Sequence, residues 1–444
     1  MHSRAVHDMN PAPAPTVPHA AGQRHLYTLL HWLWMPAILL RLTWRARGNR
    51  AYLRNLPQRF GFGSEPQGDQ PILWLHAVSV GEAQAAVPLL RNLQQRYPGY
   101  QLLVTTTTPT GRDRISQVMG DTVVLRYMPY DLPAAIGRLI RQVRPVMLMI
   151  METELWPNLF HLCSRHRIPV YLVNVRLSAH SAAGYRRFAS ISRAMLAQVA
   201  GIAAQSQTDA TRLLSLGADP DRLEVTGSIK FDFQHPASLR EQAEVLRRYW
   251  GLDRSVFIAA STHEGEEAQL LDAFVAIKSR IPSCLLVLVP RHPERFAVVA
   301  GLCQRRSLNI ALRSEPPRDL SDVEVLIGDS MGELPLFYAA SDAAFVGGSL
   351  VAVGGHNMLE PAALGLPVIF GPHVYNFSGI SRLLVDCGAA RQVKTRQQLV
   401  QAALELLSDA NLRHHMGDLG RQVVARNRGA LEQVMRMLAG HLRQ

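Results

Sequence analysis

The first candidate for acid–base chemistry is a glutamate at the start of an expected helix. His76-Ala-Val-Ser-Val-Gly-Glu82 combines the end of an apolar strand, a short loop and the first helical turn. A helix N-terminus favours the ionised form of a carboxylate, which suits a general base that takes a proton from a hydroxyl. The same pattern is equally typical of a glutamate that only satisfies the helix dipole.

Two further carboxylates follow the next inner strand, in Ile150-Met-Glu-Thr-Glu-Leu-Trp-Pro-Asn158. Because side chains alternate along a strand, we expect Glu152 and Glu154 to point to opposite faces, with one facing a cleft and the other structural. Lys230 lies in a short segment between two strand-rich regions. Its ammonium could neutralise negative charge on a donor or a transition state, or it could be an ordinary surface lysine.

The segment Thr105-Thr-Thr-Thr-Pro-Thr-Gly-Arg112 places four hydroxyls at a strand end before a helix. These groups could bind a phosphate or a sugar, or they could merely cap the helix.

The second half of the chain carries glycine-rich turns suited to a nucleotide. Phe345-Val-Gly-Gly-Ser349 and Gly354-Gly-His-Asn-Met-Leu-Glu360 predict a buried strand, a tight turn and a helix start near His356. Glycines let the backbone approach a ligand, and a helix N-terminus attracts an anion. Asn357 could cap this helix, and Glu360 could complete a capping box or accept hydrogen bonds from ribose.

Three more motifs follow strands in this half. Ser261 and Thr262 could contact phosphate, and Pro290-Arg291 could shape a pocket for a base and an anion. Gly328-Asp-Ser-Met-Gly-Glu333 predicts a turn whose backbone could read the edge of a nucleobase. Each motif is weak alone, and their convergence on the glycine-rich turns predicts a nucleotide site.

Composition limits the other possibilities. The 444 residues carry a formal net charge of +12, mostly from dispersed arginines, and four scattered cysteines. The cysteines form no metal-binding pattern and favour a reducing compartment. Aromatic residues are not interleaved with basic runs, so anionic membrane lipid or a phosphorylated substrate fits the charge better than nucleic acid.

Residues 1–23 are expected to be a disordered tail, and residues 24–47 a membrane-anchor helix with tryptophans at its edges. The arginines that follow predict that the rest of the chain is cytoplasmic. A tilted span and a shallow in-plane helix are both compatible with the pattern, as is a buried core helix.

From residue 70 apolar runs alternate with amphipathic segments, and the alternation restarts after residues 226–250. This pattern predicts an α/β protein of two Rossmann-like, doubly wound domains, 48–228 and 229–444, with the last helix crossing back. Two such domains facing a cleft form the GT-B architecture.

Taken in order, the motifs resemble the 3-deoxy-D-manno-octulosonic acid (Kdo) transferases of lipopolysaccharide assembly. The resemblance covers about residues 25 to 435 and is carried by six segments: 76–82, 151–158, 261–267, 289–296, 331–333 and 354–360. It implies a membrane-anchored GT-B enzyme on the cytoplasmic face of the inner membrane. The implied reaction is inverting transfer of Kdo from CMP-Kdo to the lipid A precursor, lipid IVA.

The resemblance also implies residue roles. Glu82 is then the base, and Glu152 and Lys230 stabilise the transition state. The implied CMP site consists of Pro290, Arg291, Met331, Gly332, Glu333, Asn357, Met358, Leu359 and Glu360, and Met358 stands where many members carry another residue. No metal or other cofactor is expected, since CMP leaves with a single phosphate. The expected partners are CMP-Kdo, the lipid A precursor and inner-membrane lipid.

Three alternatives remain open. One is another two-domain nucleotide-sugar transferase or epimerase, and the second is a non-catalytic membrane-bound binder of CMP or glycan. The third, an NAD-dependent oxidoreductase, is disfavoured because no G-x-G-x-x-G follows the first strand of either domain.

Overall fold

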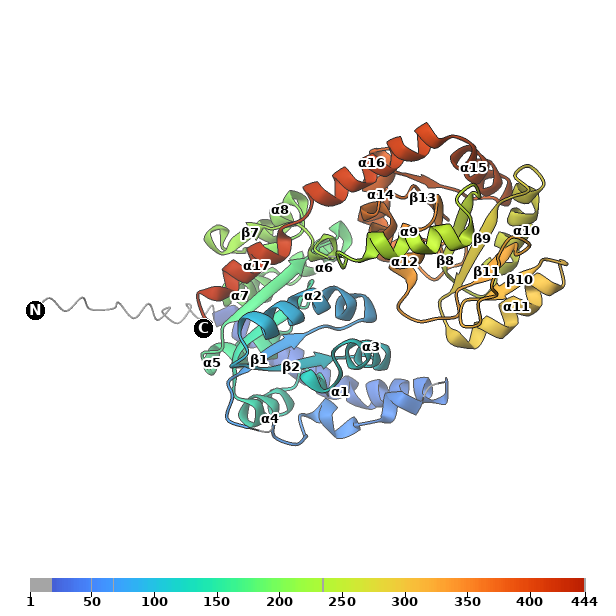
Figure 1. The fold of residues 1–444 in the computed structure, drawn as a ribbon. Coiled ribbons are helices and arrows are strands. Elements are labelled where there is room, and N and C mark those ends of the chain that lie inside the picture. The colour runs from blue at the N-terminus through green and yellow to red at the C-terminus, as the bar shows by residue number, and fades with distance from the viewer. Residues whose placement is uncertain (1–17, 49, 67, 234, 443–444) are drawn as a thin grey trace, which may run out of the picture. The chain divides into compact units, whose positions relative to one another are not determined.

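The computed structural model describes residues 18–48, 50–66, 68–233 and 235–442. The chain divides into two compact units (Figure 1). The first runs to Phe233 and takes up the chain again at Arg428, and the second is Gln234–Asn427. The division therefore falls slightly beyond the expected boundary after residue 228.

The first unit is built on a seven-stranded, all-parallel sheet in the order β3-β2-β1-β4-β5-β6-β7. Its strands are β1 Ile72–His76, β2 Gln101–Thr106, β3 Val124–Tyr127, β4 Pro145–Met151, β5 Val170–Val175, β6 Val199–Ala204 and β7 Leu223–Val225. The inner strands are continuous apolar runs because helices cover both faces of the sheet.

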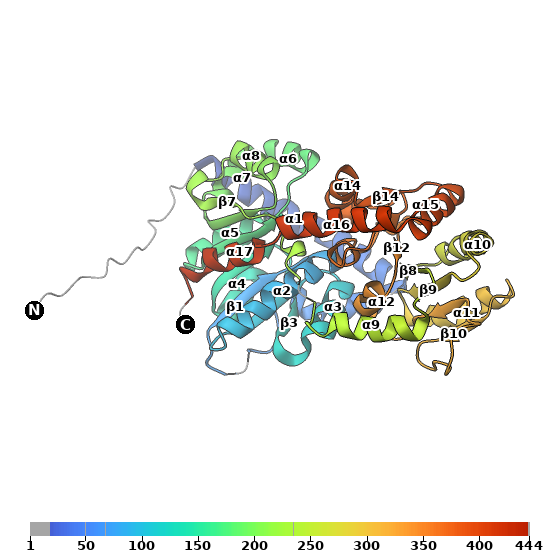
Figure 2. The same cartoon turned by 45° about the horizontal axis from the view of Figure 1, so that its top comes forward.

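The helices of this unit are α1 Pro18–Gly48, α2 Val80–Arg96, α3 Pro109–Met119, α4 Pro133–Val143, α5 Pro157–Arg165, α6 Ala179–Arg186, α7 Ala189–Leu196, α8 Gln207–Ser215 and α17 Ala430–Ala439. Short 3-10 turns are η1 Arg50–Leu53, η2 Leu56–Phe60, η3 Gly120–Thr122, η4 Pro220–Arg222 and η5 Ile229–Phe231. The C-terminal helix α17 packs on α2 (Figure 2). Asp232 fixes its start by accepting hydrogen bonds from the backbone amides of Gly429 and Leu431, both at 2.6 Å.

Helix α1 begins at Pro18, so the end of the segment expected to be disordered is helical, and residues 1–17 lie outside the described part of the chain. One face of α1 packs on the first unit through Met35, Leu42 and Ala46, all buried. Thr28 Oγ1 also donates to Asn158 Oδ1 over 3.0 Å. Among the described residues, no helix is both long enough and apolar enough for a membrane crossing.

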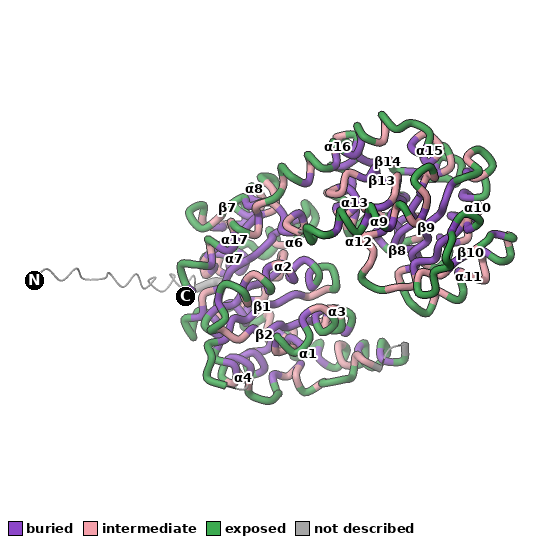
Figure 3. Tube along the Cα trace, viewed as in Figure 1, coloured by how far each residue is buried: buried purple, intermediate pink, exposed green. Residues whose placement is uncertain are grey.

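The second unit repeats the plan with the parallel order β10-β11-β9-β8-β12-β13-β14. Its strands are β8 Val256–Thr262, β9 Leu285–Pro290, β10 Ile310–Leu312, β11 Val325–Ile327, β12 Ala343–Val346, β13 Val368–Phe370 and β14 Ala390–Gln392. Its helices are α9 Leu239–Trp250, α10 Glu266–Lys278, α11 Phe296–Gln304, α12 Leu334–Ala339, α13 Leu359–Ala363, α14 Ser378–Asp386, α15 Arg396–Ser408 and α16 Ala410–Arg426, with the turns η6 Pro293–Arg295 and η7 Tyr375–Phe377. In Figure 3 the inner strands of each sheet are buried and the outward faces of the helices are exposed.

The strand orders locate where a ligand can enter each unit. In the first sheet the chain winds outward in one direction from β1 and in the other from β4. In the second sheet β8 and β12 are the corresponding strands, although β11 there lies between β9 and the edge strand β10. Open α/β sheets bind ligands at such switch points, beyond the carboxyl ends of the strands. Ligand sites are therefore expected beyond His76 and Met151 in the first unit. In the second unit they are expected beyond Thr262 and Val346.

Candidate active site

Glu82 lies in the first turn of α2, just beyond β1, and is 9% exposed. Its two carboxylate oxygens accept hydrogen bonds from the backbone amide of Val78 (2.7 Å) and the hydroxyl of Ser79 (2.9 Å). Ser79, the N-cap of α2, in turn accepts from the amide of Glu82, so the two residues hold each other at the helix start. These hydrogen bonds fix the position of the carboxyl group at the helix start.

Burial outweighs the helix N-terminus at this carboxyl group. Loss of solvent, together with the nearby charges of Glu152 and Glu154, raises the pKa of Glu82 to about 7 despite the two donated hydrogen bonds. The hydrogen bond from the Val78 amide lowers the pKa, as expected at a helix start, but the loss of hydration on burial is the larger effect. A carboxyl group with this pKa can exchange a proton near neutral pH.

Glu152 follows β4 directly and forms an ion pair with Lys230, with 3.4 Å between Oε1 and Nζ. Both side chains are about three-quarters buried. Glu152 has a φ of +55°, so the strand alternation ends at Met151 and the prediction of opposite faces for Glu152 and Glu154 does not apply. Both carboxylates instead act on Glu82 electrostatically. The structure thus brings Glu82, Glu152 and Lys230 into one neighbourhood at the switch point of the first unit.

Asn174 fixes the turn that carries Lys230. Its Oδ1 accepts hydrogen bonds from the Ser228 hydroxyl (3.2 Å) and from the Ile229 amide (3.1 Å). Asn174 is fully buried and has a φ of +58°, a conformation that asparagine tolerates better than most residues. Sequence reasoning missed this residue, although a polar side chain near the end of the apolar run Val170–Val173 was a usable signal.

His76 and Glu154 complete the polar groups around this switch point. The imidazole of His76 is fully buried, and its Nδ1 bonds to the backbone oxygen (3.0 Å) and hydroxyl (2.9 Å) of Thr105. Burial lowers the pKa of His76 to about 4, so the ring is neutral at pH 7. Trp156 packs edge-on against it and donates to Glu154 over 2.9 Å, while burial raises the pKa of Glu154.

In the second unit, Glu266 holds the glycine-rich turn after β12. This fully buried carboxylate accepts hydrogen bonds from four backbone amides, those of His263 (3.1 Å), Gly348 (2.6 Å), Ser349 (2.9 Å) and Leu350 (2.8 Å). Gly347 is required here because a Cβ atom would lie 2.5 Å from the Ser261 carbonyl oxygen. The turn after β12 is thus tied to the start of α10 after β8, across the second switch point.

Two histidines and an arginine gather near this turn. His263 and His356 stack with ring centroids 5.0 Å apart, and 2.7 Å separates their Nε2 atoms. Burial, with the charge of Arg291 as a further cause, lowers the pKa of His356 to about 3. Arg291, predicted to bind an anion, therefore lies close enough to the glycine-rich turn to act on its histidine.

The remaining predicted nucleotide residues follow β9, β11 and β12. Pro290 is the buried last residue of β9, Met331 is exposed, and Gly332 has a φ of +91°. Glu333 pairs with Arg313 through hydrogen bonds of 3.1 and 2.7 Å, which lower its pKa.

Helix α13 begins at Leu359, slightly later than predicted, and both Met358 and Leu359 are buried. Asn357 Oδ1 accepts from the Leu359 amide (3.1 Å), while its Nδ2 donates to Glu360 (3.0 Å). The expected capping box is therefore replaced by a side-chain pair.

Two Rossmann-like units of this kind define the GT-B fold. Residues 253–423 match the family model described as "Glycosyl transferases group 1". A crystal structure titled as UDP-GlcNAc 2-epimerase from Neisseria meningitidis shares the fold, with a TM-score of 0.53 and 15% identity, covering 84% of this chain and 100% of its own.

Sequence comparison specifies the family further. Residues 54–233 match the model described as "3-Deoxy-D-manno-octulosonic-acid transferase (kdotransferase)". A protein of Haemophilus influenzae named 3-deoxy-D-manno-octulosonic acid transferase is 41% identical over 94% of this chain and 99% of its own. A protein of the same name from Bordetella pertussis is 35% identical over 93% and 98%. The chain belongs to the Kdo transferase family.

Proposed function

We propose that the protein transfers Kdo from CMP-Kdo to a lipid A precursor, lipid IVA, with inversion of the anomeric centre and with Glu82 as the general base. The observation that carries the proposal is the buried Glu82 carboxyl group, with a pKa of about 7, beside the Glu152–Lys230 pair. A base is most effective when its pKa lies near the working pH.

In the proposed step Glu82 accepts the proton of an acceptor hydroxyl while that oxygen forms a bond to the anomeric carbon of Kdo. The bond from this carbon to the CMP phosphate oxygen breaks, and CMP leaves with the electron pair. Lys230, oriented by Glu152, stabilises negative charge that develops in the transition state. Because attack and departure occur on opposite sides of the carbon, the product has inverted configuration.

The donor is proposed to bind the second unit at its switch point. Arg291 offers a guanidinium to the phosphate, and the turn held by Glu266 lets the ligand approach the backbone closely. Pro290, the 331–333 turn and residues 357–360 are proposed to contact cytidine and ribose. No metal or further cofactor is part of this proposal.

Helix α1 is proposed to hold the enzyme on the inner membrane, with both units in the cytoplasm. Opposite its packed face, α1 carries an exposed apolar stripe at helical spacing, formed by Leu26, Leu29, Leu30, Leu33, Leu40 and Trp44. Trp32 and Trp34 are also exposed, and Arg41, Arg45 and Arg47 lie near the end of the helix. An apolar stripe with tryptophans and arginines suits a helix that lies in the interface of an anionic bilayer.

Mass spectrometry tests the reaction directly. Purified protein is incubated with freshly generated CMP-Kdo and lipid IVA in detergent micelles. A product heavier by one or more Kdo units is expected. CMP binding without product would contradict the acceptor or the catalytic role, and absence of CMP binding would contradict the donor.

A further inference from the structure

A cluster of arginines surrounds Tyr127 at the end of β3. The guanidinium carbon of Arg59 lies 4.3 Å from the centroid of the Tyr127 ring, and that of Arg112 lies 5.3 Å from it. The charge of Arg54 also acts on the Tyr127 hydroxyl. These residues come from the η2 region and from α3, so the tertiary structure assembles the cluster.

The cluster holds positive charge without matching negative charge. Arg59 is 5% exposed, its Nε has no hydrogen-bond partner, and its Nη2 donates to the Thr107 carbonyl (3.0 Å). Arg112 donates to the Leu125 carbonyl over 2.8 Å. Within the described parts of the chain, Arg54, Arg59 and Arg112 form no ion pair, and Asp113 is the carboxylate that acts on Arg112. Burying a cation such as Arg59 without a counter-charge is costly, so an arriving anion would be stabilised there.

The surroundings favour a phosphate. Helix α3 starts beside the cluster, with Thr108 as its N-cap and Arg112 in its first turn, so its positive end adds to the field of the guanidinium groups. Guanidinium groups match phosphate oxygens through paired hydrogen bonds.

The cluster is also linked to Glu82 and to α1. The Thr107 hydroxyl donates to the Val78 carbonyl (3.0 Å), and the Val78 amide donates to Glu82 (2.7 Å). Turn η1, which precedes Arg54, packs against α1, the helix with the exposed apolar stripe.

We propose that Arg54, Arg59 and Arg112 around Tyr127 bind a phosphate monoester on the headgroup of the lipid acceptor. This inference rests on the proposed function and adds to it the group by which the acceptor is recognised. Docked there, the phosphate would fix the acceptor relative to the loop that holds Glu82.

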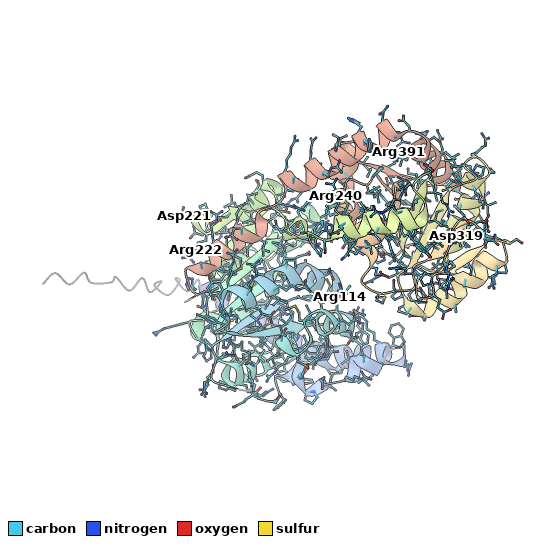
Figure 4. The ribbon with its side chains drawn as sticks, in the orientation of Figure 1. Arg114, Asp221, Arg222, Arg240, Asp319 and Arg391 are labelled. Atoms are coloured by element: carbon cyan, nitrogen blue, oxygen red, sulfur yellow. The ribbon has the colours of Figure 1, made fainter. Side chains whose placement is uncertain are left out.

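The test compares acceptors with and without the phosphate monoester in the wild type, Arg112→Gln and Arg59→Gln. Arg114→Gln is the matched control, because Arg114 lies on α3 two residues further on (Figure 4). Its side chain bonds to Gln84 of α2. Removing the phosphate should raise the acceptor KM of the wild type by about 10- to 100-fold, because a charge-assisted hydrogen bond strengthens binding by roughly this factor. In Arg112→Gln and in Arg59→Gln this difference should collapse, with CMP affinity unchanged. Arg114→Gln should behave as the wild type.

An equal rise of KM for both acceptors in Arg112→Gln would overturn the proposal. Binding to vesicles separates the possible sources of phosphate and needs no turnover, so it also applies if Kdo transfer itself is not observed. Vesicles with phosphatidic acid, a monoester, should be bound more tightly than vesicles of equal charge with phosphatidylglycerol, a diester, and Arg112→Gln should abolish that preference. Equal binding of the two kinds of vesicle by the wild type would assign the cluster to general attraction by membrane charge and would overturn the proposal. The proposal would also be overturned if free inorganic phosphate competed for the cluster while the protein showed no preference between the two lipids.

Discussion

Lys230 Nζ lies 3.4 Å from Oε1 of Glu152 and joins turn η5 to the residue that follows β4. The pair is partly shielded from water, and each partner orients the other at the switch point that also holds Glu82. The Glu82 carboxyl group is therefore not alone at this site, because the Lys230 ammonium group is held nearby by Glu152.

We expect Glu152→Gln and Lys230→Met each to lower kcat for Kdo transfer by about 100-fold, the usual cost of losing one preorganised electrostatic contact. If the pair acts as a unit, the double variant should lose little more than either single variant. The measurement is a double-mutant cycle on kcat with saturating donor and acceptor. Full additivity of the two losses would show that the residues act separately.

Glu82→Gln should abolish transfer while leaving CMP affinity unchanged, because it removes the proposed base. In the wild type, kcat/KM should rise with pH through about 7, since the ionised form is the base and burial raises the pKa from 4.5 to about 7. Steady-state rates between pH 5 and 9 test this. A flat profile, or normal turnover by the variant, would remove Glu82 as the base.

The same carboxyl group should influence stability in a defined direction. Between pH 4.5 and about 7 the folded protein holds a proton on Glu82 that the unfolded chain has released, so its contribution to stability declines as pH rises through this window. Glu82→Gln should flatten that part of the pH dependence of Tm. An unchanged slope would mean that Glu82 titrates normally in the folded state.

Asn174→Ala should lose about 1–3 kcal/mol of stability, because two buried donors around Ser228 and Ile229 lose their acceptor. It should also lower kcat, since the turn that carries Lys230 is released, with little effect on CMP affinity. Denaturant unfolding and steady-state kinetics measure the two effects. Asn174→Asp, which keeps the acceptor oxygen, should lose less of both, and equal losses would contradict the assigned role.

Glu266→Gln should weaken CMP binding by about tenfold or more, because an amide group replaces one oxygen that accepts backbone hydrogen bonds in the glycine-rich turn. Glu264→Gln is the control, since that carboxylate is 87% exposed and belongs to the same segment. Isothermal titration with CMP measures the affinity. Similar CMP affinities of the two variants would contradict a role of the glycine-rich turn in donor binding.

The apolar stripe on α1 predicts membrane binding. Leu33→Glu and Leu40→Glu should each weaken binding to vesicles with anionic lipid by about tenfold or more, since each removes a leucine from the stripe proposed to enter the bilayer interface. Leu252→Glu changes a leucine of similar exposure in the second unit and serves as the control. Co-sedimentation measures the bound fraction, and equal loss in all three variants would contradict a specific role of α1.

The apolar runs alone determined the α/β class and the two doubly wound sheets, because buried parallel strands must be apolar on both faces. The ends of the strands could also be recognised in the sequence, so Glu82, Glu152 and Arg291 could be predicted as candidate site residues. The motif order further determined the family, which the comparisons confirmed.

Tertiary structure decided what each of these groups experiences. Burial, which no local pattern encodes, outweighs the expected effect of the helix on Glu82, and the left-handed conformation of Glu152 brings it to Lys230. Asn174 and Glu266 act on backbone amides far away in sequence, so their importance depends on contacts that only folding creates. The arginines around Tyr127 are likewise unremarkable along the chain, and their charges meet only because η2 and α3 pack beside the same strand.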